Sequence, residues 1–435
     1  MKYSRNGPTA GVLSYIDAFA RKGTVFTNFY SASTFTTPSV ATMLTGLYPS
    51  ETLVYQLYTR ARAANAERSV PHLMRTAGYA TGAFLSSPVA FYLAKGLEDE
   101  FDALPEPQFP TGRMQALWNV TTPLHQDSSL GNRLEEYYDL EHVWTSVGRL
   151  PKNLAMRYWP VASFEQARQV LAKLPDGFFL WVHLVTPHEP YLPDSVDRGR
   201  FLPDAELRSF EEESGLRWQP HYAPDQQSQV DRRRLAHDEF IATADRAFGA
   251  FMSDLEKSGK LRDTTVIVSA DHGESFEGAV YTHRSEYLTR PVIHVPLISR
   301  TPGQEDGRTV AFTADQTALA PTILELAGVP KPDWMRGQSL AGWLNRNGQG
   351  EGEGLAFTQH FEKNSVFKPV RHGTVGVIDG QYQYLVYLDT RKGALRPLNE
   401  AQIWNLDRSA EHPARAEALR TAIHARFPDL VQNPT

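Results

Sequence analysis

The sequence predicts an α/β protein whose mostly parallel sheet is sandwiched between helices. Short apolar segments alternate with amphipathic ones along the chain, and no internal repeat interrupts the alternation. Two of the short segments, 178–185 and 265–269, are apolar almost throughout, as expected of strands that are buried on both faces. The 435 residues are enough for one large unit and a smaller appendage.

The predicted elements follow from residue type and spacing. Strands are short and rich in β-branched or aromatic residues, and we place them at 24–30, 79–85, 178–185, 264–270 and 292–299. Helices show apolar residues at helical spacing, and we place them at about 164–174, 237–258, 315–327 and 413–426. A small antiparallel hairpin is predicted at 375–379 and 382–388, around Asp379-Gly380.

Two irregular stretches suggest how the chain is divided. Residues from about 105 to 161 lack clear periodicity and are typical of an insertion or lid. Residues 348–354 form a loop rich in Gly and Glu, which is the best internal boundary. We therefore predict a main α/β domain at 1–347 and a small C-terminal subdomain at 355–435.

Composition excludes several classes of function. The net charge is −6, and no run rich in Lys and Arg carries interleaved aromatic residues, so nucleic acid is not a predicted partner. The chain has no cysteine, which excludes disulfides, thiolate metal sites and cysteine nucleophiles. No apolar stretch approaches the roughly 18 residues of a membrane span. Localisation and oligomeric state are left open.

Residues 33–46 predict a loop that opens a short helix. Thr37 suits the N-cap, Pro38 the first helical position and Gly46 the end of the helix. The Thr36 hydroxyl would then lie at a helix N-terminus, where the dipole and free amides favour an alkoxide and a bound anion. An ordinary capped surface helix would show the same pattern, so these residues alone leave both interpretations open.

Polar residues also follow two of the predicted strands. Asp271 and His272 come directly after a buried strand, where open α/β sheets bind ligands, and their donors suit a divalent cation. His188 lies between two prolines, and an imidazole held in this way can donate a hydrogen bond to a charged oxygen. The alternatives are an Asp-His pair that caps the next turn and, for His188, a structural turn.

These segments resemble the sulfatase family, a branch of the alkaline phosphatase superfamily. Residues 36–46 are similar to its active-site signature, with Thr36 at the Cys or Ser position, and 271–273 to its metal motif. Residues 187–191 are similar to its Pro-His-x-Pro-Tyr loop. Further matching segments extend over almost the whole chain, at 13–23, 320–328, 335–340 and 403–406. The resemblance implies an alkaline phosphatase/sulfatase-like fold.

The resemblance also implies a metal-dependent hydrolase or transferase of phospho- or sulfo-esters. Thr36 would be the nucleophile, and Asp271, His272 and Thr36 would bind a divalent metal ion, whether Ca²⁺, Mn²⁺, Mg²⁺ or Zn²⁺. His188 and His283 would stabilise the anionic oxygens of the ester. The partner would be a small-molecule, glycan-linked or lipid-linked ester.

Three departures from the family pattern bear on the substrate. Thr36 replaces the Cys or Ser that sulfatases oxidise to formylglycine, Val40 replaces an Arg, and Ser86 replaces a Lys. A threonine nucleophile is familiar in relatives that handle phosphorus, so a phosphate monoester or diester is favoured. One alternative is a sulfuric ester hydrolase that works without formylglycine. The other is a non-catalytic member of the family that acts as a binding protein.

A fourth departure concerns the metal. The family opens with a buried strand that ends in a metal-binding Asp pair, and this chain starts just after that point. Asp271, His272 and Thr36 alone are few ligands for Ca²⁺ or Mg²⁺. We therefore expect an N-terminally shortened version of a longer protein, whose missing part would leave room for a leader or an anchor. A longer reading frame without an upstream Asp-Asp strand would contradict this expectation.

Overall fold

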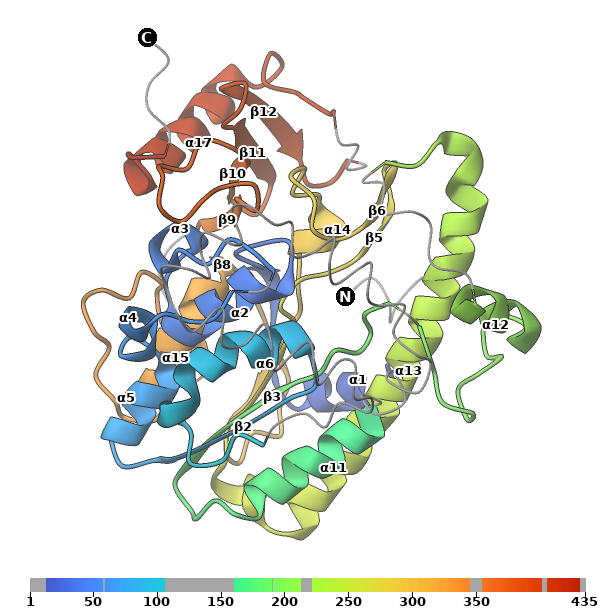
Figure 1. The fold of residues 1–435 in the computed structure, drawn as a ribbon, viewed down its shortest axis with the longest axis vertical. Helices are drawn as coiled ribbons and strands as arrows, with labels where there is room; N and C mark the ends of the chain where they lie inside the picture. The colour runs from blue at the N-terminus through green and yellow to red at the C-terminus, as the bar shows by residue number, and fades with distance from the viewer. Residues whose placement is uncertain are drawn as a thin grey trace.

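A layer of strands lies between helices, and a second sheet lies toward the C-terminus (Figure 1). The computed structural model describes residues 13–57, 59–105, 160–189, 191–212, 221–344, 354–400 and 405–430. The predicted α/β class, with strands between helices and a small C-terminal antiparallel sheet, is confirmed. The predicted insertion at about 105–161 lies outside the described residues except at its ends.

The main sheet contains four strands in the order β4-β7-β1-β8. β1 (Thr24–Tyr30) pairs in parallel with β8 (Arg308–Asp315) and antiparallel with β7 (Leu297–Arg300). β4 (Val266–Ser269) is antiparallel to β7 as well. β4, β1 and β8 therefore run in one direction, and β7 opposes them.

One predicted strand was wrong in its first half. Residues 292–299 include the end of a short helix, α14 (Arg290–Ile293), before β7 begins. Pro291 lies in the first turn of α14, where a missing N–H costs nothing and the fixed φ favours a helix. The apolar residues of this segment are buried whether they are helical or extended, so apolar composition alone did not separate the two states.

A second, parallel pair of strands continues the same layer. β2 (Ala80–Leu85) pairs with β3 (Phe178–His183). Apolar side chains of β3 and β4 pack in one cluster with the same helices, so the two sheets present a common face. Among the described strands, β3 pairs only with β2, and β4 pairs only with β7.

Helices cover both faces of this layer. On β2, Phe84 packs with one helix group while Ala83 and Leu85 pack with the other, as expected because alternate side chains of a strand point to opposite faces. The first group is α1 (Ser14–Arg21), α11 (Pro160–Leu171) and α13 (Gln227–Lys257). The second is α2 (Thr36–Thr45) and α6 (Pro88–Ala94), with α5 (Val70–Thr76) and α15 (Leu319–Leu326) beside them.

The helix predictions were correct in place and less so in length. The predicted helix at 237–258 begins earlier, at Gln227, because its polar first part has no apolar periodicity to reveal it. The helix predicted at 315–327 is shorter, since a 3₁₀ turn (Gln316–Ala318) precedes α15. The last helix, α17 (Pro413–Arg426), has the predicted bounds.

The C-terminal sheet is antiparallel, in the order β12-β11-β10-β9. Its strands are β9 (Ala356–His360), β10 (Thr374–Ile378), β11 (Tyr382–Tyr387) and β12 (Lys392–Pro397). α17 packs on the sheet through Leu419 and Ile423. The predicted hairpin is confirmed, with Gly380 at a φ of 90° in its turn. The division at 347 and 355 stays a prediction.

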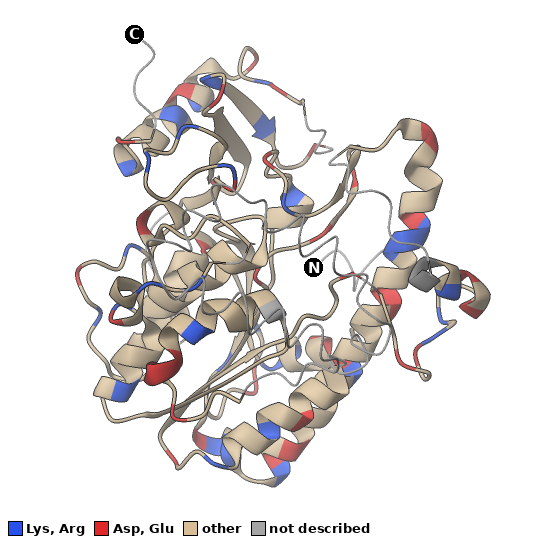
Figure 2. Cartoon of the chain, viewed as in Figure 1, with Lys and Arg blue, Asp and Glu red and all other residues tan. Residues whose placement is uncertain are grey.

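Short elements complete the described chain. They are α3 (Pro49–Thr52), α4 (Ala63–Ala66), a 3₁₀ turn (Lys95–Glu100), α12 (Asp204–Glu212), 3₁₀ turns Pro224–Gln226 and Lys260–Asp263, the hairpin β5 (Ser275–Glu277) and β6 (Val280–Thr282), and α16 (Ala341–Leu344). None of the helices that the structure describes is both long and apolar enough to span a membrane. Lys and Arg residues are interspersed with Asp and Glu residues along the described chain (Figure 2).

Candidate active site

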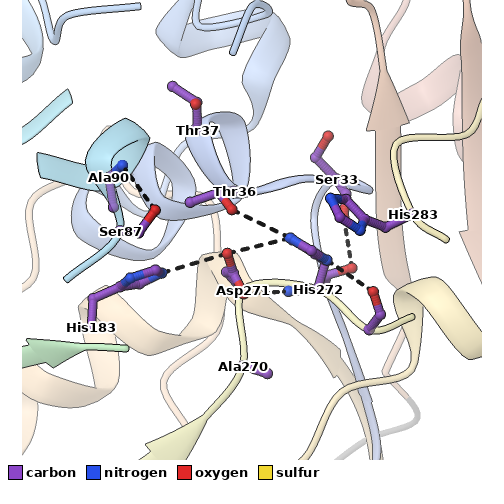
Figure 3. A network of polar contacts seen from close by, with 12 residues as sticks. Ser33, Thr36, Thr37, Ser87, Ala90, His183, Ala270, Asp271, His272 and His283 are labelled. Atoms are coloured by element: carbon purple, nitrogen blue, oxygen red, sulfur yellow. Dashed lines mark hydrogen bonds and ion pairs between the residues drawn. The ribbon is translucent and has the colours of Figure 1, made fainter. Parts of the chain in front are cut away.

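The ends of β3 and β4 meet at the start of α2. His183 is the last residue of β3, and Asp271 follows β4 closely. The His183 Nε2 and Asp271 Oδ2 atoms are 3.5 Å apart. Thr36, the first residue of α2, points toward the same place (Figure 3). This is the position at which an α/β sheet is expected to bind its ligand.

α2 begins earlier than predicted, because its N-cap is Phe35 and not Thr37. Phe35, with an extended backbone, is the N-cap, and Thr36 is already helical. Thr37 does not cap the helix, because its hydroxyl donates a hydrogen bond to the Leu57 carbonyl. Gly46 ends α2 in the left-handed region, as predicted. Thr36 is therefore in the first turn, where the positive end of the helix dipole favours a negative charge on its oxygen.

Asp271 and His272 lie against the Thr36 hydroxyl. The His272 Nε2 atom is 3.3 Å from Thr36 Oγ1 and 3.5 Å from Asp271 Oδ2. The other carboxylate oxygen, Oδ1, accepts a hydrogen bond from the His272 backbone amide at 3.0 Å. Burial acts to raise the pKa of Asp271, but the imidazoles of His272 and His183 and the Thr36 hydroxyl hold it well below its usual range. Asp271 is therefore a carboxylate at neutral pH.

The other two predicted histidines are brought to the same cluster. The His283 ring stacks on the His272 ring with 4.3 Å between centroids, and His188 meets His283 edge-on at 5.0 Å. His283 Nδ1 is 3.2 Å from both carboxylate oxygens of Glu274. Burial lowers the pKa of His283 to about 4, against the opposing effect of the Glu274 charge. His188 is exposed and donates from Nδ1 to the Glu189 carbonyl at 2.6 Å.

The two residues that replace family cations have structural contacts in this chain. Val40 is fully buried and packs with α6 and β2. Ser86 is also fully buried, and its Oγ atom accepts a hydrogen bond from the Val185 amide at 2.8 Å. Ser86 therefore joins the end of β2 to the segment that follows β3, and neither position offers a positive charge to an anion.

Two residues of the site were missed by the sequence reasoning. His183 ends an apolar strand, which is the same signal that singled out Asp271, and it could have been found in that way. Gln316 is fully buried; its Nε2 donates to the Ala270 and Asp271 carbonyls at 2.9 and 2.8 Å, and its Oε1 accepts from the Ala32 amide at 2.9 Å. Gln316 thus ties the segment after β4 to the segment before α2, and no local pattern marks it.

The described residues do not by themselves complete a metal site. Asp271, His272 and Thr36 are close together as predicted, yet no three His, Asp or Glu side chains in the described part of the chain are placed to hold a metal ion. A single carboxylate also falls short of the oxygen-rich shell that Ca²⁺ or Mg²⁺ requires. The predicted metal ligands therefore stay a prediction.

Family models match most of the chain. The model described as "Sulfatase" matches residues 3–329, and the model described as "N-sulphoglucosamine sulphohydrolase, C-terminal" matches residues 278–402. Among curated proteins, an arylsulfatase K from Danio rerio is 25% identical over 313 residues, covering 65% of this chain and 55% of the relative. An ulvan-active sulfatase from Formosa agariphila is 26% identical over 355 residues, covering 75% and 59%. The chain thus spans little more than half the length of these relatives.

Solved structures show the same fold at low sequence identity. A phosphonate monoester hydrolase from Silicibacter pomeroyi has a TM-score of 0.64 at 19% identity, with 97% of this chain and 91% of that chain covered. A protein solved with its substrate D-glucosamine-2-N,6-O-disulfate has a TM-score of 0.71 at 15% identity, with 98% and 94% covered. The fold, the order of the motifs and the family model agree, and this chain belongs to the sulfatase family.

Proposed function

We propose that the protein hydrolyses sulfo- or phospho-esters, with the Thr36 hydroxyl as the attacking group. The observation that carries the proposal is the placement of Thr36 in the first turn of α2, 3.3 Å from His272 Nε2 and beside the cluster that includes His188 and His283. Attack on a tetrahedral sulfur or phosphorus centre needs a positioned nucleophile and hydrogen-bond donors for the equatorial oxygens. The backbone amides of Thr36 and Thr37 at the start of α2 would supply such donors, whereas Pro38 has no N–H and the Ser39 amide donates to the Phe35 carbonyl.

The evidence is divided on whether the substrate is a sulfate ester or a phospho-ester. Thr36 cannot become formylglycine, and Val40 and Ser86 add no positive charge, which favoured a phospho-ester. The curated relatives are named sulfatases, which supports a sulfate ester, while the phosphonate monoester hydrolases share the fold. We therefore place a sulfate ester first, with direct attack by the hydroxyl in place of formylglycine chemistry. A phospho-ester is the second candidate.

Members of this family typically use a divalent metal ion. The described residues do not fit such an ion by themselves, so the proposed reaction assigns no step to a metal. The same shortage of donors supports a rival proposal, namely a binding protein that has kept the fold and lost turnover. Binding of a sulfate ester without product release would favour that rival.

The test is hydrolysis of aryl sulfate, aryl phosphate, a phosphate diester and a phosphonate monoester, each with added Ca²⁺, Mn²⁺, Mg²⁺ or Zn²⁺ and with a chelator. Thr36→Ala should lower kcat/KM by roughly 10³-fold or more, because it removes the nucleophile. Thr37→Val is the matched control, since this neighbouring hydroxyl donates to the Leu57 carbonyl and points away from the site (Figure 3). Equal turnover in Thr36→Ala and the parent would reject the proposal.

A further inference from the structure

The loop between β9 and β10, residues 361–373, is held in shape by one buried amide side chain. Asn364 Nδ2 donates to the Phe361 and His372 carbonyls at 2.8 and 2.7 Å, and Oδ1 accepts from the Arg371 and His372 amides at 2.8 and 3.1 Å. Both donors and both lone pairs of the amide are therefore used. They tie the two ends of the loop together, so a ligand that binds the loop has little backbone to order.

This loop presents an aromatic ring to solvent. Phe367 is 58% exposed, more than any other Phe, Tyr or Trp in the described part of the chain. Its apolar neighbours Val366 and Val370 are partly buried against the core of the C-terminal sheet. A single exposed ring is common on a protein surface, and what distinguishes Phe367 is its setting on a fixed loop among positive charges.

The positive charges of the loop are Lys363, Lys368 and Arg371, and all three residues are exposed. The acidic residue of the loop, Glu362, is neutralised by an ion pair with Arg284. The chain as a whole has a net charge of −6, so the loop is a local reversal of sign. Such a reversal attracts an anionic ligand to this part of the surface.

The first strand of the loop connects it to the candidate active site. His360, directly before the loop, pairs with the hydroxyl of Thr34, which is two residues before the proposed nucleophile. The partner of Glu362, Arg284, is the residue that follows His283. The loop therefore begins beside two of the segments that carry site residues.

The body of the loop contacts a third such segment. Gln56 Nε2 is 3.5 Å from the Asn364 carbonyl oxygen, to which it donates. The next residue, Leu57, accepts a hydrogen bond from the hydroxyl of Thr37, the neighbour of Thr36. A ligand whose ester lies at Thr36 would therefore be large enough to reach the loop if it extends by one or two further groups.

We propose that the 361–373 loop binds a second part of the substrate, and that the substrate is a polysulfated glycan. The ring of Phe367 would pack against the C–H face of one sugar, while Lys363, Lys368 and Arg371 would pair with sulfate groups that are not cleaved. This inference rests on the proposed function and names the substrate class for it.

An anionic lipid surface is the competing ligand, because it also attracts aromatic rings and cations. Two observations favour the glycan. Val366 and Val370 pack on the core, which leaves one ring to insert into a bilayer. The loop is also continuous with the candidate active site, where a soluble substrate would occupy both places at once.

The experiment measures the Kd of a heparin-derived tetrasaccharide by isothermal titration calorimetry, in the Thr36→Ala background so that no ester is turned over. Adding Phe367→Ala or Arg371→Gln should each raise Kd by about five- to tenfold. Phe367→Tyr should keep the binding, since the ring remains. Val196→Ala and Lys257→Gln are the matched controls, because these side chains are 73% and 75% exposed on other segments and should leave Kd unchanged.

Three outcomes would overturn the inference. They are an unchanged Kd in Phe367→Ala and Arg371→Gln, equally tight binding of the tetrasaccharide after its sulfate groups are removed, and binding of phosphatidylglycerol vesicles through Phe367 without binding of the tetrasaccharide. Binding that depends on the loop, with no turnover of any ester by the parent, would reject the proposed function and keep the binding surface. Turnover of aryl esters without such binding would do the reverse.

Discussion

The C-terminal sheet and the β3–β4 region contain comparably apolar strands, yet they bury them to different extents. Every residue of β10 is buried, whereas in β3 only His183 is buried and every residue of β4 is intermediate. β10 pairs along both edges, with β9 and β11. Among the described strands, β3 and β4 each pair along one edge only. Apolar composition alone therefore does not set burial in these two regions, and neither does the number of paired edges, since in the described part of the chain β9 pairs only with β10 and is buried throughout.

The two regions also differ in what lies at the ends of their strands. β3 ends in His183, and Asp271 follows β4, so both open strands bring polar groups toward Thr36. His360, which ends β9, is buried about as deeply as His183, but it pairs with the Thr34 hydroxyl, which is 2.8 Å from its Nδ1 atom. The buried strands of the C-terminal sheet thus contribute to stability. The ends of β3 and β4 instead present polar groups toward Thr36, as expected at the carboxyl ends of α/β strands.

The largest change in stability that we predict for this comparison is for a substitution in the C-terminal sheet. Leu385, on β11, is fully buried and packs with Leu288 and Ile293, which lie outside the C-terminal sheet. Leu385→Ala should lower the free energy of unfolding by about 2–5 kcal/mol, through lost burial and the cavity that remains. Equilibrium urea unfolding of the parent and the variant measures it. A loss well under 1 kcal/mol would mean that the C-terminal sheet relaxes to fill the cavity and is packed less tightly than the structure indicates.

A second prediction concerns pH and the same sheet. Burial lowers the pKa of His360 to about 3, with help from the charges of Arg284 and Lys363, while the unfolded chain keeps a value near 6.5. Between these values the unfolded state binds more protons, so stability is present above pH 6.5 and falls as the pH drops toward 3. At pH 5 the loss should be about 2 kcal/mol. His360→Gln should remove this loss.

The measurement compares urea unfolding of the parent and His360→Gln at pH 7.5 and pH 5. We expect the parent to lose more stability than the variant over this interval, because glutamine does not titrate. Parallel losses would show that His360 is protonated in the folded protein and that the sheet around it is more open than the structure indicates.

The fold could be predicted from the sequence where periodicity and turn residues agree. The hairpin around Asp379-Gly380 and the helix at 413–426 were predicted with nearly correct bounds, because a glycine turn and a proline start mark them. The first half of 292–299 was wrong because a buried helical turn and a buried strand have similar composition. The direction of β7 could not be read from its residues, since pairing depends on distant strands.

The site was predicted in part, for a related reason. Thr36, Asp271, His272, His188 and His283 were singled out by motifs, and the structure brings them together. Their roles remain predictions. Gln316 was missed, because its contacts with the Ala32 amide and the Asp271 carbonyl join segments far apart in the sequence. The contact of His272 Nδ1 with the Gly273 carbonyl, at 2.9 Å, is likewise one that no motif displays.

The smallest predicted change in stability is for a substitution on β3, and it tests most directly whether the two regions differ in burial. Leu180, on β3, is only partly buried, where it packs against the cluster shared with α11 and α13. Leu180→Ala should therefore cost about 1 kcal/mol, roughly half of what full burial of a leucine contributes. The same urea titration as for Leu385→Ala makes the two leucine truncations directly comparable. A cost of 2 kcal/mol or more would show that β3 is covered in solution, so that its second edge has a neighbour and the contrast between the two regions disappears. A small cost would establish that a strand of Phe, Leu, Trp and Val can remain half-open when the groups at its end face a reaction centre.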